Sequence, residues 1–160
     1  MFAVAACAAC GDPQVPEGAA AHDACAPLTI AAAAAASSVQ QAGVAGALAL
    51  WRDHGVSAFD PAPAGTTAAA APPSIAIEFD DAATAFHGVY DPAGDRVLIN
   101  RDLVDPATLA IVIAHELGHA FGLVHIPPDT RLSLMNPGNL VTPPTDADQQ
   151  AVEALWGPCR

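Results

Sequence analysis

The chain has 160 residues, which is enough for one domain of ordinary size. Hydrophobic residues make up 52% of it, and this excludes an intrinsically disordered chain, although aromatic residues reach only 5%. Five arginines and no lysines stand against 17 acidic residues, so the net charge is −12. A protein of that sign is repelled by phosphate groups, which argues against nucleic acids and anionic lipid surfaces as partners.

The first 27 residues are rich in alanine, proline and glycine and predict a tether ahead of one domain over 28–160. Within this tether, Val4-Ala5-Ala6-Cys7 has the pattern of small residues that bacterial lipoprotein signals place before a lipidated cysteine. The apolar stretch before Cys7 is short for a complete signal. Two alternatives therefore stay open: the true start lies upstream and Cys7 carries a lipid, or the match arises by chance.

The four cysteines are Cys7, Cys10, Cys25 and Cys159, and no two pairs have the spacing of a zinc ribbon. Cys25 precedes the first organised segment, and Cys159 is the penultimate residue. If the protein is exported, a disulfide between these two cysteines would tie the ends of the domain together. No unbroken apolar run of 18 residues is present, so we expect no transmembrane helix.

The apolar side chains of residues 30–54 recur at helical spacing, with Ser37 or Ser38 as the N-cap and Gly55 as the stop. The polyalanine run 31–36 is either the first turns of this helix or a low-complexity spacer.

After a loop over 60–73, three strands are predicted from alternating and β-branched residues: 75–79, 85–90 and 96–100. Acidic residues around these strands could supply calcium ligands, although their spacing matches no calcium-binding loop: Asp80, Asp81, Asp91, Asp95 and Asp102.

The dipeptide Asp105-Pro106 suits the N-cap and first position of a helix that should stop at Gly122. A last short helix is predicted over 146–156, before Gly157-Pro158. The order of the elements predicts an α+β domain whose sheet is formed in the first half of the chain.

The residues with the clearest chemistry lie at the end of the second predicted helix. His115 and His119 are four residues apart, so on a helix both can present a nitrogen to one metal ion. Gly122 would let the chain turn back, and His125 could then reach the same ion. Glu116 is placed to contact a water molecule rather than the metal. Three neutral imidazoles with one open position form the donor set of a catalytic zinc site.

A plainer interpretation of these histidines is an ordinary core helix with hydrogen-bonded imidazoles. An ordinary core helix would explain the apolar neighbours, but it does not explain three histidines and a glutamate within eleven residues. The isolated His22, His54 and His87 are instead expected to lie at the surface or to form local hydrogen bonds.

The stretch 115–125 resembles the zinc signature of the metzincin metallopeptidases. That family also has a methionine turn after the third histidine, and Ser-Leu-Met-Asn-Pro at 133–137, with Met135, resembles it. The matrixin branch is the most similar, on account of Ala-Leu-Trp at 49–51, Ala-Leu-Trp-Gly at 154–157 and the proline at 137.

The resemblance implies a zincin fold with a small twisted mixed sheet, one catalytic Zn²⁺ and endopeptidase activity on a protein or peptide substrate. Glu116 would be the general base, and Met135 would form an apolar floor under the histidines. The substrate would add as a strand to the sheet edge near 84–91. The segment 126–140 would wall a substrate pocket, with an apolar preference set by three residues: Ile126, Leu132 and Leu134.

Two departures from the matrixin pattern matter. The chain lacks the loop rich in histidine and aspartate that holds a structural zinc and calcium in that branch, and no propeptide of useful length is expected. We therefore expect a minimal, exported bacterial-type monomer. Two other functions stay open: an inactive zinc-binding or interaction domain of the same fold, and a metal-dependent hydrolase of non-peptide amides or esters.

Overall fold

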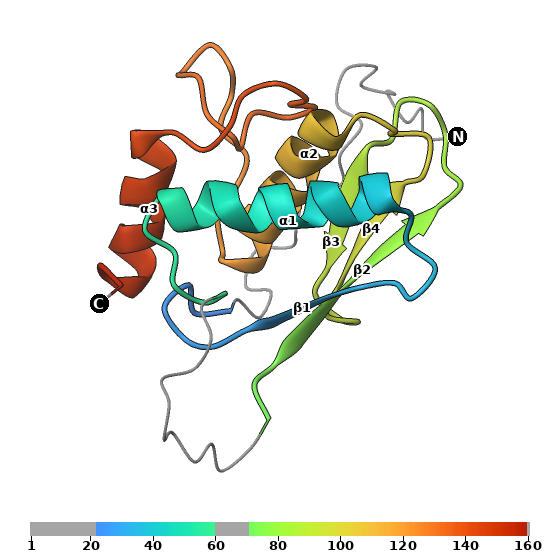
Figure 1. The fold of residues 1–160 in the computed structure, drawn as a ribbon. Coiled ribbons are helices and arrows are strands. Elements are labelled where there is room, and N and C mark those ends of the chain that lie inside the picture. The colour runs from blue at the N-terminus through green and yellow to red at the C-terminus, as the bar shows by residue number, and fades with distance from the viewer. Residues whose placement is uncertain (1–21, 60–70, 160) are drawn as a thin grey trace, which may run out of the picture.

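The computed structural model describes residues 22–59 and 71–159, so Cys7 and Cys10 lie outside the described residues. Four strands form one mixed sheet with the order β1-β2-β4-β3, and three helices accompany it (Figure 1). The α+β class predicted from the sequence is confirmed. The strands are β1 (Thr29–Ala32), β2 (Ser74–Asp80), β3 (Gly88–Asp91) and β4 (Arg96–Asn100), and the helices are α1 (Ser38–Asp53), α2 (Pro106–Ala120) and α3 (Asp146–Trp156).

The sheet is parallel over β1, β2 and β4, while β3 runs antiparallel to β4 and forms one edge. The alternation that predicted β2 matches its burial, because Ile75 and Ile77 are fully buried while Ala76 and Glu78 are only half-buried. The predictions of β2 and β4 are confirmed. The predicted strand 85–90 is shifted, since β3 begins only at Gly88, after a turn closed by the Phe86 N–H and the Ala83 carbonyl.

The predicted start of the first helix was wrong. The helix begins at Ser38, where Ser37 and Gln40 form a capping box, and residues 29–32 form strand β1 instead. Ile30 is in register with Ile75 of β2, so pairing between distant segments overrides the helix preference of alanine. Neither of our two interpretations of the alanine run, helix or spacer, included this strand.

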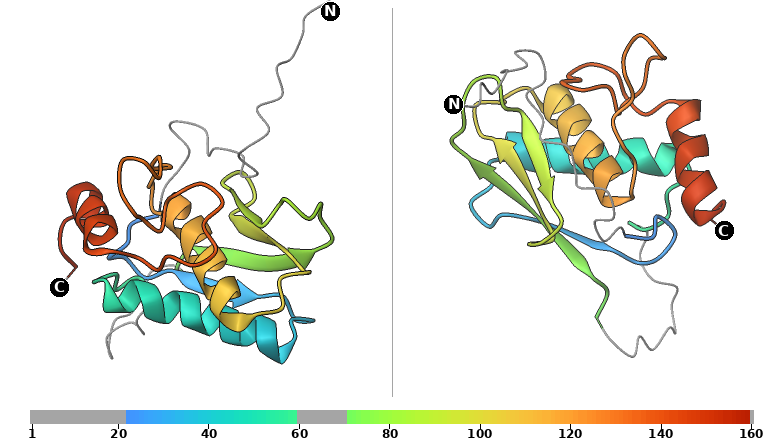
Figure 2. Two further views of the ribbon diagram at one scale, coloured as in Figure 1. Left: turned by 90° about the horizontal axis from the view of Figure 1, so that it is seen from above. Right: turned by 180° about the vertical axis from the view of Figure 1, so that it is seen from behind.

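Helices α1 and α2 cover the same face of the sheet, and α3 lies near the C-terminal end of α1 (Figure 2). Two glycines of α1 allow the close packing of α1 on α2. A Cβ atom at Gly43 would lie 2.6 Å from Cβ of Leu109, and one at Gly46 would lie 2.9 Å from Cβ of Ala110. The indole nitrogen of Trp51 also donates to the Ala114 carbonyl at 2.9 Å. This contact holds the second half of α2, which carries the histidines, within the core.

The described part of the predicted tether, residues 22–27, packs onto the domain. Ala24 is fully buried, and the backbone N–H of His22 donates to the Ala120 carbonyl at 2.7 Å. Cys25 forms a disulfide with Cys159, with the Cα atoms 5.0 Å apart. The pairing considered from the sequence is thus present, and it joins the two ends of the described chain.

Replacing Cys25 with serine is expected to lower the melting temperature by roughly 5–15 °C under oxidising conditions. The bridge closes a loop with a sequence separation of 134, and a disulfide of this kind contributes about 2–4 kcal/mol by restricting the unfolded chain. Thermal unfolding followed by circular dichroism, with and without reductant, measures the effect. Cys159→Ser removes the same bridge from its other end and should melt like Cys25→Ser. Equal melting of the wild type in both conditions would contradict a stabilising bridge.

Candidate metal centre

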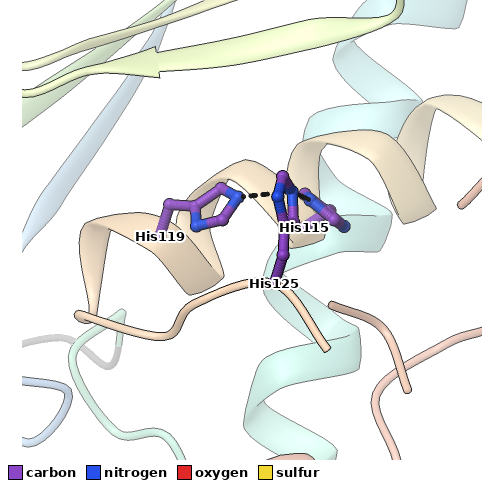
Figure 3. Close-up of side chains that lie close together, drawn as sticks. All are labelled: His115, His119 and His125. Carbon is purple, nitrogen blue, oxygen red and sulfur yellow. Dashed lines mark hydrogen bonds between the residues drawn. The ribbon is translucent and has the colours of Figure 1, made fainter. Parts of the chain in front are cut away.

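The end of α2 and the turn after it bring three histidines together. His115 and His119 lie one helical turn apart on α2, and the helix ends at Ala120. Gly122 has a φ of +91°, the left-handed conformation that glycine adopts without strain. The chain thereby reverses and directs His125 back toward the helix (Figure 3). The expected geometry of the motif is confirmed.

The three imidazoles converge through their Nε2 atoms. Nε2 of His125 lies 3.1 Å from Nε2 of His115 and 3.2 Å from Nε2 of His119; dashed lines mark these two contacts in Figure 3. His115 and His119 are buried, and His125 is half-buried. Within the described ranges, these histidines form the one group of three or more potential ligands close enough to hold a metal ion.

The protons on the imidazoles favour a metal over a hydrogen-bonded cluster. Nδ1 of His115 lies 2.7 Å from the Leu134 carbonyl, and Nδ1 of His119 lies 2.9 Å from the Leu123 carbonyl. A carbonyl can only accept, so both Nδ1 atoms carry a proton, and the Nε2 atoms of both rings point at His125. The N–H of His125 can donate with good geometry to one of these two Nε2 atoms, whereas one cation can bind the Nε2 atoms of all three histidines.

The two distances from His125 are close to those at a tetrahedral ion, and the ligand atoms of all three histidines lie within 4.8 Å of one another. Two nitrogens bound to one zinc at its usual distance of 2.0–2.1 Å lie about 3.3 Å apart. Burial lowers the pKa of His119 to about 3, with a smaller contribution from its neighbour His115. The imidazole of His119 is therefore neutral at pH 7, which is the form that binds metals.

The turn 133–137, which resembles a methionine turn, lies directly against the helix that carries His115 and His119. Met135 is 1% exposed, and a Cβ atom at Gly118 would lie 2.6 Å from its sulfur. Since Gly118 stands between His115 and His119, the absence of a side chain there makes room for the methionine. The turn also supplies the Leu134 carbonyl to His115.

Glu116 is 2% exposed and points to the edge strand of the sheet. Its Oε2 accepts a hydrogen bond from the backbone N–H of Tyr90 at 2.8 Å. The close approach depends on Gly88, where a Cβ atom would lie 3.0 Å from Cγ1 of Val112 and 3.3 Å from Cγ of Glu116. Our sequence analysis missed this contact. A glycine within a strand was the available signal, because it often marks close approach of another segment.

The predicted pocket wall is only partly supported. Ile126 lines a cavity of about 280 Å³ together with Val124, Met135 and Leu155. Leu132 is 73% exposed. Leu134 is fully buried, so its side chain is not available to a substrate, and this part of the prediction was wrong.

The other candidate residues lie elsewhere. Nδ1 of His54 is 2.8 Å from the Leu50 carbonyl, which is the expected local contact. Nε2 of His22 is instead 2.9 Å from Oδ1 of Asp95, which is 73 residues away in the sequence. His87 is half-buried beside the start of β3.

Four of the five acidic residues considered for calcium contact a basic side chain. Asp80 and Asp81 contact Arg101, while Asp91 contacts Arg96 at 3.0 Å. Asp95 faces His22, and Asp102 is exposed. In the part of the chain that the structure describes, no group of three acidic residues meets, so the calcium site stays a prediction.

Comparisons with protein-family models and with curated proteins found no match to this chain. None of the described helices has the length and hydropathy needed to cross a bilayer. A function for this protein is therefore inferred from the geometry of the histidine cluster.

Proposed function

We propose that the protein is a zinc-dependent endopeptidase of the metzincin clan, similar to the matrixin branch. The observation that carries this proposal is the convergence of three imidazole Nε2 atoms beside a buried carboxylate that contacts an edge strand. A structural zinc site needs no such carboxylate, since it has four protein ligands and no water to activate.

The residues that would hold the zinc ion are His115, His119 and His125. The Nδ1 atoms of His115 and His119 contact backbone carbonyls, and these contacts direct the Nε2 atoms of the two buried rings at His125. When bound, zinc supplies a Lewis acid and lowers the pKa of a water ligand to about 7.

Glu116 is the proposed general base. The Tyr90 N–H holds Oε2, so the carboxylate keeps a fixed orientation, and on α2 its residue directly follows His115. In the proposed reaction, Oε1 accepts a proton from the attacking water molecule and then delivers it to the leaving amine nitrogen. The water oxygen bonds to the carbonyl carbon as the C–N bond breaks, and the resulting carboxylic acid and amine exchange a proton to give a carboxylate and an ammonium, so the proton count balances.

The outer edge of β3 is the proposed docking strand for an extended peptide. The Asn100 N–H donates to the His87 carbonyl at 2.9 Å, so by antiparallel alternation the backbone groups of Gly88 and Tyr90 face away from β4. The Tyr90 N–H already donates to Glu116. The Gly88 N–H is therefore the proposed donor on β3 for a substrate carbonyl. A substrate paired there passes beside the carboxylate.

We also propose that the protein is exported and acts as a monomer. The Cys25–Cys159 disulfide is compatible with an oxidising compartment. A lipid on Cys7 would anchor it to the cell envelope, but that residue lies outside the described part of the chain.

The function is tested with purified protein loaded with zinc. We expect it to cleave a denatured protein at internal peptide bonds, with products identified by mass spectrometry. A chelator should abolish cleavage, and added zinc should restore it. Stoichiometric zinc without cleavage would instead support a non-catalytic binding domain. Turnover of esters or small amides without peptide cleavage would support another hydrolase.

A further inference from the structure

A buried carboxylate from α3 lies behind the metal centre. Asp148 is 1% exposed and stands at the third position of its helix. It accepts hydrogen bonds from the hydroxyl and backbone N–H of Thr145 at 2.8 and 2.9 Å, which form part of the helix cap. It also accepts from the Ser133 hydroxyl and, at 2.9 Å, from the Leu134 N–H.

The hydrogen bonds that Asp148 accepts from Ser133 and Leu134 are not part of the helix cap. A capping box joins residues of one helix end, whereas Ser133 and Leu134 belong to the turn that carries Met135. The Ser133 hydroxyl in turn accepts from the Met135 N–H at 3.0 Å. Asp148 therefore fixes three consecutive residues of the methionine turn.

This turn orients the ring of His115 through the Leu134 carbonyl. The Leu134 carbonyl lies 2.7 Å from Nδ1 of His115, and the amide of Asn139 donates to the same carbonyl at 3.0 Å. Asp148 thus orients the Leu134 backbone, and the Leu134 carbonyl orients the ring. Loss of an outer partner of a metal-binding histidine commonly weakens metal affinity by about 10–100-fold.

We propose that Asp148 is a positioning residue of the metal centre, which acts through Leu134 to keep Nε2 of His115 directed at the ion. This inference rests on the proposed function insofar as it assumes that the histidines bind zinc. It requires no peptidase activity, so the two proposals can fail separately.

The Asp148→Asn variant tests the proposal. The amide has nearly the same volume but only one accepting oxygen, so it cannot accept both from Ser133, which donates to Oδ1 of Asp148, and from Leu134, which donates to Oδ2. We expect the dissociation constant for zinc, measured by competition with a chromogenic chelator, to rise about 10–100-fold. In metal-free protein, NMR should also show faster solvent exchange of the His115 Nδ1–H, because its carbonyl partner is no longer held.

Two controls separate positioning from simple destabilisation. Thr145→Ala removes the hydroxyl of the helix cap but leaves the hydrogen bonds that Asp148 accepts from Ser133 and Leu134. Asp146→Asn makes the same chemical change as Asp148→Asn at an exposed position of the same helix. Both controls should bind zinc within about threefold of the wild type, even where the Thr145 variant melts at a lower temperature.

Three results would overturn the proposal: unchanged zinc affinity in Asp148→Asn, an equal loss of affinity in Thr145→Ala, or unchanged exchange at His115. If Asp148→Asn does not fold, Ser133→Ala takes its place. That variant removes one of the two links to the turn and should also weaken zinc binding and speed exchange at His115; wild-type values for both would overturn the proposal. If the wild type itself binds no zinc, the exchange measurement still decides whether Asp148 orients His115.

Discussion

A Glu116→Gln variant is expected to bind one zinc ion per chain and to lose peptide hydrolysis by about 10²–10⁴-fold in kcat. Glutamine has nearly the same shape, and its carbonyl oxygen can still accept from the Tyr90 N–H. The amide cannot take up a proton at neutral pH, so the general base is lost while the site keeps its form. Steady-state kinetics together with metal analysis of the same sample measure both quantities.

Glu78→Gln provides the matched control. Glu78 lies half-buried on β2 and contacts Arg96 at 3.7 Å, so the same chemical change is made away from the histidines. It should leave kcat and zinc content unchanged. Turnover of the Glu116 variant within tenfold of the wild type would remove Glu116 from its proposed role.

The second large effect concerns the metal itself. His119→Ala leaves two of the three converging nitrogens, and we expect zinc affinity to fall by more than about 100-fold, beyond the range for an outer partner. Dialysis against metal-free buffer followed by elemental analysis should then find zinc in the wild type and almost none in the variant. Peptidase activity should disappear with the metal.

His54→Ala is the corresponding control, since His54 is bound to the Leu50 carbonyl on α1 and belongs to no cluster. It should retain the full zinc content. If the His119 variant keeps its zinc through dialysis, the set of ligands proposed here is wrong.

The parts of the fold that follow from local patterns were predictable from the sequence. Asp105 accepts from the Thr108 N–H at 2.8 Å as the N-cap of α2, and Thr145 caps α3. The spacing of His115, His119 and His125, with Gly122 before the last of them, predicted the cluster that is observed. Each of these features depends on residues within a few positions of one another.

The features that were missed depend on distant partners. Residues 29–32 form a strand because they lie beside β2, and their own alanines favour a helix. The contact of Glu116 with Tyr90 joins residues 26 apart, and Asp148 reaches Leu134 across 14 residues. Single-sequence patterns carry no record of which segments become neighbours in space.

The bond between Tyr90 and Glu116 has a practical consequence for ligand design. A peptide mimetic built to extend the sheet at β3 would gain little from a carbonyl opposite Tyr90, because that amide proton is already engaged. The same carbonyl placed opposite Gly88 would find an outward-facing donor. Compounds that differ only in this one-residue shift should therefore differ in potency, and the difference should shrink if the carboxylate is replaced by an apolar group.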